Sequence, residues 1–406
     1  MSRWLTAVIA LTSLAACQGR DPDATWLDTA TETVAPAAAG SRYPHLAASP
    51  EGTPVMSWLE PTADGGFALR YSAWVGSKWT RPGIVSSGRD WFVNWADFPS
   101  VVPLGRRAWA AHWLQQKPGD AYAYDVRIAV SADGGVTWSA PLSPHDDGTP
   151  TEHGFVSLFG TDESLQAAWL DGRHTSGEHD HEGGTAGAMT LRTAGIGNDG
   201  RLLGADDEID ARVCDCCQTS AALAREGPVL VYRDRGEDET RDIALVRRTA
   251  DGWSSPIHVA NDGWKIRACP VNGPAVDARD DAVVVAWFTA PDRPRVRLAF
   301  SDDGGRTFSS AFEVASGKVA GRVDVVLLPD GRAVVSWLAE VPGGAEIRAQ
   351  PFTRAGPAGM TSVVAHADVA RASGFPQMAR AGDGLLFAWT RSGESSGVRA
   401  AWARLL

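Results

Sequence analysis

Four of the chain's five cysteines form its densest group of chemically active side chains. Cys214, Cys216 and Cys217 stand almost side by side, and Cys269 occupies the same point of the next sequence repeat. If the segment is extended, the sulfurs of Cys214 and Cys216 point to one side and that of Cys217 to the other. Thiolates suit Cu(I) and Zn(II), so this group predicts a site for a soft metal, copper or zinc.

Four of the nine histidines are expected on the same face of the fold as these cysteines. Imidazoles could complete the ligand shell of a metal held by thiolates. The four are His153, His174, His179 and His181. We therefore expect the cysteines to converge at one place, with at least one of these histidines in the same cleft.

Oxidation is the competing interpretation, because cysteines of exported proteins commonly form disulfides. A bridge from Cys269 to one of the other three would staple two neighbouring repeats. If the cysteines converge and none of these histidines is near, the staple is the right interpretation and the metal site should be dropped. A catalytic thiol is a third interpretation, and one bridged pair beside free thiols also fits the spacing.

Seven short repeats must position these residues. Each contains an apolar strand that ends in an aromatic residue, with apolar or alternating strands before and after it. The marker aromatics lie 50 to 63 residues apart, a period typical of propeller blades rather than helical solenoids. They are Trp58, Trp113, Trp169, Tyr232, Trp287, Trp337 and Trp389.

The sequence therefore predicts an all-β fold, a β-propeller of seven four-stranded blades in a single domain over residues 41–406. The last repeat stops at Leu406 without its fourth strand, and residues 25–35 resemble a spare one. We expect this N-terminal strand to close the ring by pairing around Val398–Ala403, because closure protects sheet edges. Six blades are the alternative, since residues 351–365 are weakly patterned.

The N-terminus has the pattern of an export signal. Arg3 and an apolar run lead to Leu14-Ala15-Ala16-Cys17, which resembles a bacterial lipoprotein signal. The resemblance implies removal of residues 1–16, lipid attachment at Cys17 and a membrane anchor. Because Gln18 follows, it also implies the outer membrane. Residues 17–40 would form a tether that includes the closing strand.

The composition fits an exported globular protein. The 38 basic and 49 acidic residues give a net charge of −11 without a basic run, which argues against a nucleic-acid partner. After Leu14 no apolar run is long enough to span a bilayer. We expect a monomer.

Two turns carry the pattern S-x-D-x-G-x-T followed by an aromatic residue. They span residues 131–138 and 301–308, with Asp133 and Asp303 at the third position. Glycines permit the tight turn, and the aspartate can accept hydrogen bonds from backbone N–H groups within it. The pattern resembles the Asp-box, or BNR repeat, of sialidases and related propellers. This resemblance implies a propeller fold and a structural role for both aspartates.

The resemblance to sialidases also implies an enzyme that acts on acidic glycans. Arg42 opens an Arg-Tyr-Pro segment similar to the family's Arg-Ile-Pro, whose arginine binds the substrate carboxylate. Asp97, Glu152 and Asp171 would then do the acid–base work. The family's nucleophilic tyrosine from a late blade has no counterpart, because the last tyrosine is Tyr232. Whether the chain is an enzyme stays open at this point.

Tryptophans in the connections between blades give a second hint. Trp91, Trp95 and Trp264 could stack on sugar rings if exposed, or seal neighbouring blades if buried. We favour a binding propeller with a cysteine–histidine ligand or metal site at the mouth of its central channel. An exo-sialidase type of glycoside hydrolase is the alternative. The partners would be the membrane, through the lipid, and a glycan or small molecule.

Overall fold

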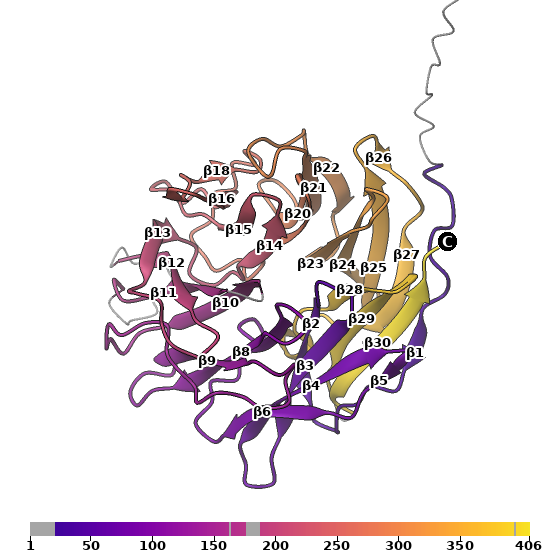
Figure 1. The fold of residues 1–406 in the computed structure, drawn as a ribbon. Coiled ribbons are helices and arrows are strands. Elements are labelled where there is room, and N and C mark those ends of the chain that lie inside the picture. The colour runs from indigo at the N-terminus through magenta and orange to yellow at the C-terminus, as the bar shows by residue number, and fades with distance from the viewer. Residues whose placement is uncertain (1–20, 162–163, 176–186, 394) are drawn as a thin grey trace, which may run out of the picture.

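The computed structural model describes residues 21–161, 164–175, 187–393 and 395–406. Over these ranges the chain forms a ring of seven β-sheets and one short 3-10 helix, η1 (Arg371–Ser373). Figure 1 shows the sheets arranged as the blades of a propeller. The predicted seven-bladed propeller is confirmed, and the six-bladed alternative is wrong.

The first three blades follow one another along the chain, and neighbouring strands in each pair antiparallel; in blade one the last two strands both pair with the third. Blade one contains β2 (Arg42–Ala48), β3 (Pro54–Pro61), β4 (Phe67–Val75), β5 (Lys78–Trp79) and β6 (Gly83–Gly88). Blade two contains β7 (Ser100–Pro103), β8 (Trp109–Gln116) and β9 (Tyr124–Ser131), and a single bridge from Ile128 to Leu142 stands in for its outer strand. Blade three contains β10 (His153–Gly160), β11 (Leu165–Asp171), β12 (Met189–Ile196) and β13 (Asp207–Val213).

The next three blades repeat this arrangement, with a short extra strand in two of them. Blade four contains β14 (Ser220–Ala224), β15 (Gly227–Arg233), β16 (Ile243–Thr249), β17 (Gly252–Trp253) and β18 (Ile257–His258). Blade five contains β19 (Ala275–Arg279), β20 (Ala282–Thr289), β21 (Arg295–Ser301) and β22 (Phe312–Ser316). Blade six contains β23 (Val319–Leu327), β24 (Ala333–Val341), β25 (Gly344–Thr353), β26 (Gly356–Pro357) and β27 (Ser362–Ala367).

Blade seven joins the two ends of the chain. It contains β28 (Gln377–Ala381), β29 (Gly384–Arg391), β30 (Gly397–Arg404) and, as its outer strand, β1 (Thr31–Thr33). Glu32 lies opposite Ala401 in the antiparallel β1–β30 pair, which Figure 1 shows at the edge of the ring. Closure of the ring by an N-terminal strand is therefore confirmed. Cys17 and the signal segment lie outside the described residues.

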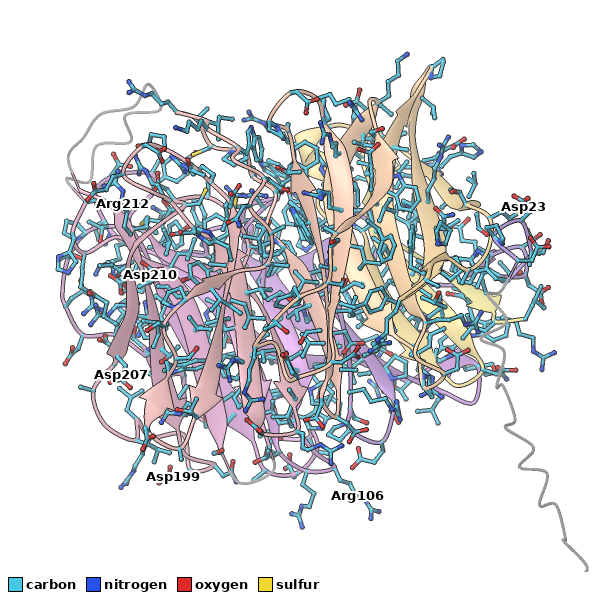
Figure 2. The ribbon with its side chains drawn as sticks, turned by 90° about the horizontal axis from the view of Figure 1, so that it is seen from above. Asp23, Arg106, Asp199, Asp207, Asp210 and Arg212 are labelled. Atoms are coloured by element: carbon cyan, nitrogen blue, oxygen red, sulfur yellow. The ribbon has the colours of Figure 1, made fainter. Side chains whose placement is uncertain are left out.

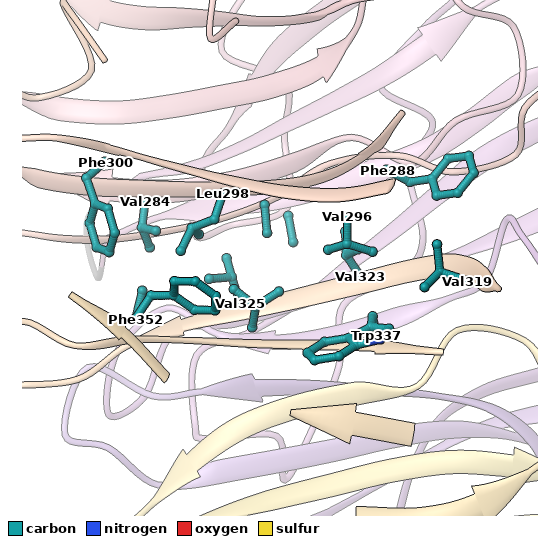
Figure 3. Close-up of a cluster of buried hydrophobic side chains, with 14 of the residues drawn as sticks. Val284, Phe288, Val296, Leu298, Phe300, Val319, Val323, Val325, Trp337 and Phe352 are labelled. Atoms are coloured by element: carbon teal, nitrogen blue, oxygen red, sulfur yellow. The ribbon is translucent and has the colours of Figure 1, made fainter. Parts of the chain in front are cut away.

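Hydrophobic side chains hold neighbouring blades together. The seven marker aromatics all lie on the second strand of their blade, and each residue is at most 6% exposed. Between blades five and six, Leu298 and Phe300 of β21 face Val325 of β23 and Trp337 of β24 in one apolar cluster (Figure 3). Because each blade has its own apolar interface with the next, the repeat pattern was readable in the sequence. Among the described residues, no helix has the length and apolar character that crossing a membrane requires.

The innermost strands surround a channel of about 800 Å³. Carboxylates on these strands accept hydrogen bonds from the main chain of the next blade: Asp277 from Leu327 N–H at 2.7 Å, and Asp324 from Met378 N–H at 2.6 Å. Burial raises the pKa of Asp277 to about 6 and that of Asp324 to about 7. These carboxylates therefore brace the ring from inside.

The two ends of the channel are built differently. The Asp-box turns lie at one end, where the N–H of Gly134 binds the carbonyl of Arg107 in the first hairpin of the same blade. In each turn the aspartate accepts hydrogen bonds from the threonine four residues later, at 2.9 Å from N–H and 2.6 Å from the hydroxyl, for Asp133 and Asp303 alike. Figure 2 shows Arg106 and Asp199 at this end and Arg212, at the end of β13, toward the opposite one. The connections between blades, which carry the cysteines, share the end of Arg212.

Candidate functional site

The cysteine segment connects blade three to the innermost strand of blade four. It begins directly after β13 and ends three residues before β14. The N–H of Cys214 donates to the carbonyl of Arg233 at 3.0 Å, next to the bridge between Val213 and Asp234. These two contacts fix the main chain at Cys214, the first of the cysteines.

Three sulfur atoms converge in this segment. The Sγ atoms of Cys214, Cys216 and Cys217 all lie within 4.8 Å of one another, and those of Cys214 and Cys217 are 3.5 Å apart. Cys269 lies in the connection between blades four and five, and its interaction with the Cys216 thiol lowers the pKa of Cys269. All four are free thiols. The structure thus brings three of the four predicted cysteines within 4.8 Å of one another, and the approach of the Cys269 sulfur to them stays a prediction.

Buried arginines face the sulfurs. Nη1 of Arg241, a residue only 3% exposed, lies 3.1 Å from Sγ of Cys214. Arg233 is buried beside it and donates to the main-chain carbonyls of Arg241, Asn272 and Phe288. Burial alone would raise the pKa of Cys214. Hydrogen bonds from Cys216 and Cys217, followed by the charges of Arg241 and Arg233, outweigh it and hold that pKa well below its usual value. The site therefore stabilises a thiolate at Cys214.

A second layer of charges holds the arginines in place. Glu239 accepts hydrogen bonds from Nη2 of Arg241 at 2.8 Å and Nη2 of Arg235 at 2.9 Å. Nη1 of Arg235 reaches Asp215, between the cysteines, at 3.1 Å. Each guanidinium is thus clamped on its outer side, and its orientation toward the cysteine segment is fixed.

Glu152 and Asp97, predicted as acid–base residues, lie close to each other and bracket Tyr124. The phenol donates to Glu152 at 2.6 Å and is 2.8 Å from Oδ2 of Asp97. Burial raises the pKa of both carboxyls, that of Asp97 to about 7, and the charges of Asp215 and Cys269 act in the same direction on Glu152. Glu152 therefore borders the thiol group.

Asp97 has a clear role in the fold. Its Oδ1 accepts the N–H of Phe155, which has a positive φ of 54°, in a bulge of β10. A Cβ on Gly154 would lie 1.9 Å from Asp97, so only glycine fits there. Asp97 is 2% exposed and Tyr124 is fully buried. Because a substrate cannot reach such groups directly, the geometry favours a structural role for Asp97 over acid–base catalysis.

His153 turns away from the cysteines into a buried charged group. Its Nε2 lies 3.1 Å from Asp147 and 3.7 Å from Asp171, and its ring stacks on His145 with centroids 3.9 Å apart. Asp171 also binds Arg173 at 2.7 Å and the indole of Trp169. Asp171 is therefore buried and fully engaged, which corrects the expectation that it is available for acid–base work.

The described histidines do not join the thiols. In the ranges that the structure describes, the groups of potential ligands within 4.8 Å of one another combine cysteines with cysteines or histidines with carboxylates, never cysteine with histidine. His174 is exposed and lies 3.9 Å from Glu208. His179 and His181 lie outside the described residues. His153 and His174 thus do not form the expected mixed site, and the part of that expectation that concerns His179 and His181 stays a prediction.

The buried histidine group predicts a pH dependence of stability. Burial lowers the pKa of His153, but the hydrogen bond to Asp147 and the charges of Asp171, Asp147 and Asp125 outweigh it, so the pKa is raised. A raised folded-state pKa gives stability that is present below the unfolded value of about 6.5 and lost as pH rises through the folded value. His153→Gln should therefore remove part of the fall in Tm between about pH 6 and pH 9.

His258→Gln is the matched control for this prediction. His258 also has a raised pKa through Asp234, but it lies at the surface of blade four. Surface pairs contribute little, so this variant should keep the wild-type slope of Tm against pH. Equal slopes for wild type and His153→Gln would contradict the proposed ionisation of His153.

The remaining predicted residues pack within the fold. Arg42 lies over the ring of Phe67 at 5.2 Å, and its Nε is 3.4 Å from the carbonyl of Gly40. Trp91 stacks on Trp113, Trp95 on Phe375, and Trp264 lies against Phe288 under Arg233. These tryptophans join neighbouring segments, and none of these contacts reveals a sugar platform.

Sequence reasoning missed the arginines and His145. Arg233 is the last residue of β15, and Arg241 lies in the loop between β15 and β16, which shares its end of the ring with the cysteine segment. The run Arg233 to Arg241 contains three arginines, and this cluster was the sequence signal that could have pointed to positive charge beside the cysteines. His145 lies in the irregular outer segment of blade two, where no pattern fixed its register.

Comparisons with known proteins show the fold alone. No family model matches the chain, and neither does any curated protein. A puromycin-hydrolysing peptidase of Mycobacterium tuberculosis aligns with a TM-score of 0.50 at 10% identity, over 93% of this chain and 55% of that one. The α-L-arabinofuranosidase Arb93A of Fusarium graminearum aligns at 0.47 and 13%, over 95% and 98%. The Hadza microbial sialidase Hz136 aligns at 0.43 and 15%, over 79% and 66%. Of these three alignments only the first reaches a TM-score of 0.50, and at 10% identity it indicates a shared fold alone.

Proposed function

We propose that this chain is an exported propeller that binds one soft metal ion, Cu(I) or Zn(II), through the thiolates of Cys214, Cys216 and Cys217. The convergence of the three sulfurs within 4.8 Å carries the proposal. Around an ion with metal–sulfur bonds of about 2.3 Å, ligand sulfurs lie roughly 4 Å apart, so small side-chain rotations suffice. Soft thiolates alone can hold such an ion, so the site does not require an imidazole from the described residues.

The disulfide interpretation is the main competitor, and the absence of a described histidine favours it. Arg241 weighs against it. A disulfide sulfur carries no charge, so oxidation of Cys214 would leave the buried Nη1 of Arg241 facing a neutral atom. Arg241 would keep its ion pair with Glu239 but would lose the thiolate that faces its Nη1, and with it part of the interaction that offsets the burial of its charge. Metal binding instead uses the thiolate that Arg241 stabilises.

A sialidase-type hydrolase that acts on acidic glycans is less well supported. Asp97 and Glu152 have the raised pKa of a general acid, but Asp97 is buried and bonded at both oxygens. Arg42 contacts Phe67 and Gly40 at the start of blade one. Lipid attachment at Cys17 and an outer-membrane location are part of the proposal and rest on the signal pattern of the sequence.

Metal content tests the proposed function. The full chain is produced in an exporting bacterial host and purified without a metal-affinity tag, and copper and zinc are measured together with free thiols. We expect wild type to carry one copper or zinc ion per chain, and Cys214→Ser to carry none. His153→Gln is the matched control and should keep the metal, because His153 lies in the carboxylate group.

Two results would contradict the proposal. One is a reduced wild-type protein that takes up neither Cu(I) nor Zn(II) when each is supplied. The other is a freshly isolated protein in which all four cysteines are oxidised, since disulfides would then occupy the site.

A further inference from the structure

The four thiols differ in their access to solvent. Cys269 is exposed, Cys216 is half-buried, and Cys214 and Cys217 are each 1% exposed. An incoming reagent therefore meets Cys269 first. The difference follows from the chain, because Cys269 lies in the connection before β19 while the other three lie in the segment that closes blade three.

Cys216 links the exposed thiol to the buried ones. Its Sγ lies within 4.8 Å of those of Cys214 and Cys217. Its interaction with Cys269 is also the largest influence on the pKa of Cys269, which it lowers. Cys216 is therefore the member of the buried group that the exposed Cys269 meets first.

The two segments that carry these thiols are held together. Gln218, directly after the cysteine segment, accepts the N–H of Gly273 at 3.0 Å and donates to the carbonyl of Ala96 at 2.6 Å. A Cβ on Gly273 would lie 2.1 Å from the carbonyl oxygen of Gln218, so the approach of the two segments requires glycine. The connection that bears Cys269 is therefore anchored beside Cys216.

We propose, on the basis of the metal site proposed above, that the protein takes up Cu(I) from a small copper–thiolate complex, with Cys269 as the entry ligand and Cys216 as the next. The resident ion is held by Cys214, Cys216 and Cys217. Cys269 binds the ion during transfer and is released from it afterwards.

Each transfer step exchanges one sulfur for another. A bond forms between Cu(I) and the sulfur of Cys269 as the bond to the donor sulfur breaks, and the proton of Cys269 passes through solvent to the departing thiolate. Cys216 then displaces Cys269 in the same way, and Cys269 regains a proton. Copper stays in the +1 state throughout, so the sequence needs no oxidant or reductant. Such exchanges are limited by access to the attacking sulfur, which gives Cys269 its role.

Affinity and loading rate separate an entry ligand from a resident one. Reduced full-length protein is mixed with a Cu(I)–glutathione complex, and the rate of copper uptake is followed by stopped-flow absorbance. Cu(I) affinity is measured separately by competition with a chromophoric Cu(I) chelator. The variants are Cys269→Ser, Cys214→Ser and, as a matched control in the same connection, Ala268→Ser.

We expect Cys269→Ser to load on the order of tenfold more slowly than wild type while its affinity changes by less than about threefold, because only the accessible sulfur is lost. Ala268→Ser should match wild type in both measurements. Cys214→Ser should lose affinity itself.

Three outcomes would overturn the transfer role. Cys269→Ser could load as fast as wild type, which would exclude an entry function. It could lose as much affinity as Cys214→Ser, which would make Cys269 a ligand of the resident ion. Ala268→Ser could slow loading as much as Cys269→Ser, which would trace the effect to the connection rather than the sulfur. A wild-type protein that binds no Cu(I) would instead overturn the proposed function itself.

Discussion

Replacing Trp26 by alanine should destabilise the protein by about 3 to 5 kcal/mol, the usual cost of removing a buried tryptophan. Trp26 is 2% exposed and packs among side chains of blades six and seven. Its indole donates to the carbonyl of Met360 at 2.8 Å, and its own carbonyl accepts the N–H of Leu406 at 2.9 Å. Trp26 therefore fastens the N-terminal segment to blades six and seven. Chemical denaturation of wild type and variant measures the effect.

Glu32→Ala is the control for this prediction. Glu32 lies on β1 itself, but its side chain is exposed and only 3.8 Å from Arg399 in a surface ion pair. Such pairs contribute less than about 1 kcal/mol. If Trp26→Ala were as stable as Glu32→Ala, ring closure would not depend on this anchor.

Replacing Arg241 by methionine should weaken metal binding by roughly 10- to 100-fold, the range typical when a group that supports metal ligands is removed. Arg241 does not touch the metal in this account. It acts through Cys214, 3.1 Å away, and its charge balances the anionic sulfurs in a buried place. Competition with a chelator measures the affinity, and thermal melting shows whether the variant is folded.

Two further variants separate this charge effect from a general disturbance of the loop. Arg241→Lys keeps the charge and should recover part of the affinity. Arg212→Met removes a nearby arginine that also approaches Glu239, at 3.5 Å, and should leave affinity unchanged. Equal loss in the lysine and methionine variants would show that packing, rather than charge, explains the effect.

The fold was predictable because each blade repeats its own apolar pattern. Trp58 and Trp389 mark equivalent second strands in the first and last blades. Because the last repeat is one strand short, the pattern also predicted that residues 25–35 supply its fourth strand. The connections that carry Cys269 and the other cysteines approach each other at Gly273 and Gln218, as the same register predicts, since both precede innermost strands of consecutive blades.

The chemistry around the sulfurs was less predictable. The expected partner His153 instead begins β10 and contacts Asp147, which belongs to the irregular outer segment of blade two. Arg241 takes the place near Cys214 that a histidine was expected to occupy. The register of the repeats predicts which main-chain segments lie at one end of the ring. The direction of a side chain within a long connection depends on contacts that leave no periodic pattern in the sequence.

X-ray absorption at the edge of the bound metal identifies its ligands directly. The full-length reduced protein is loaded with Cu(I), or examined with whatever copper or zinc it carries when isolated. We expect a first shell of sulfur atoms only, three for Cu(I), at about 2.3 Å. A first shell dominated by nitrogen or oxygen, which would place the ion among the histidines and carboxylates near His153, would contradict it.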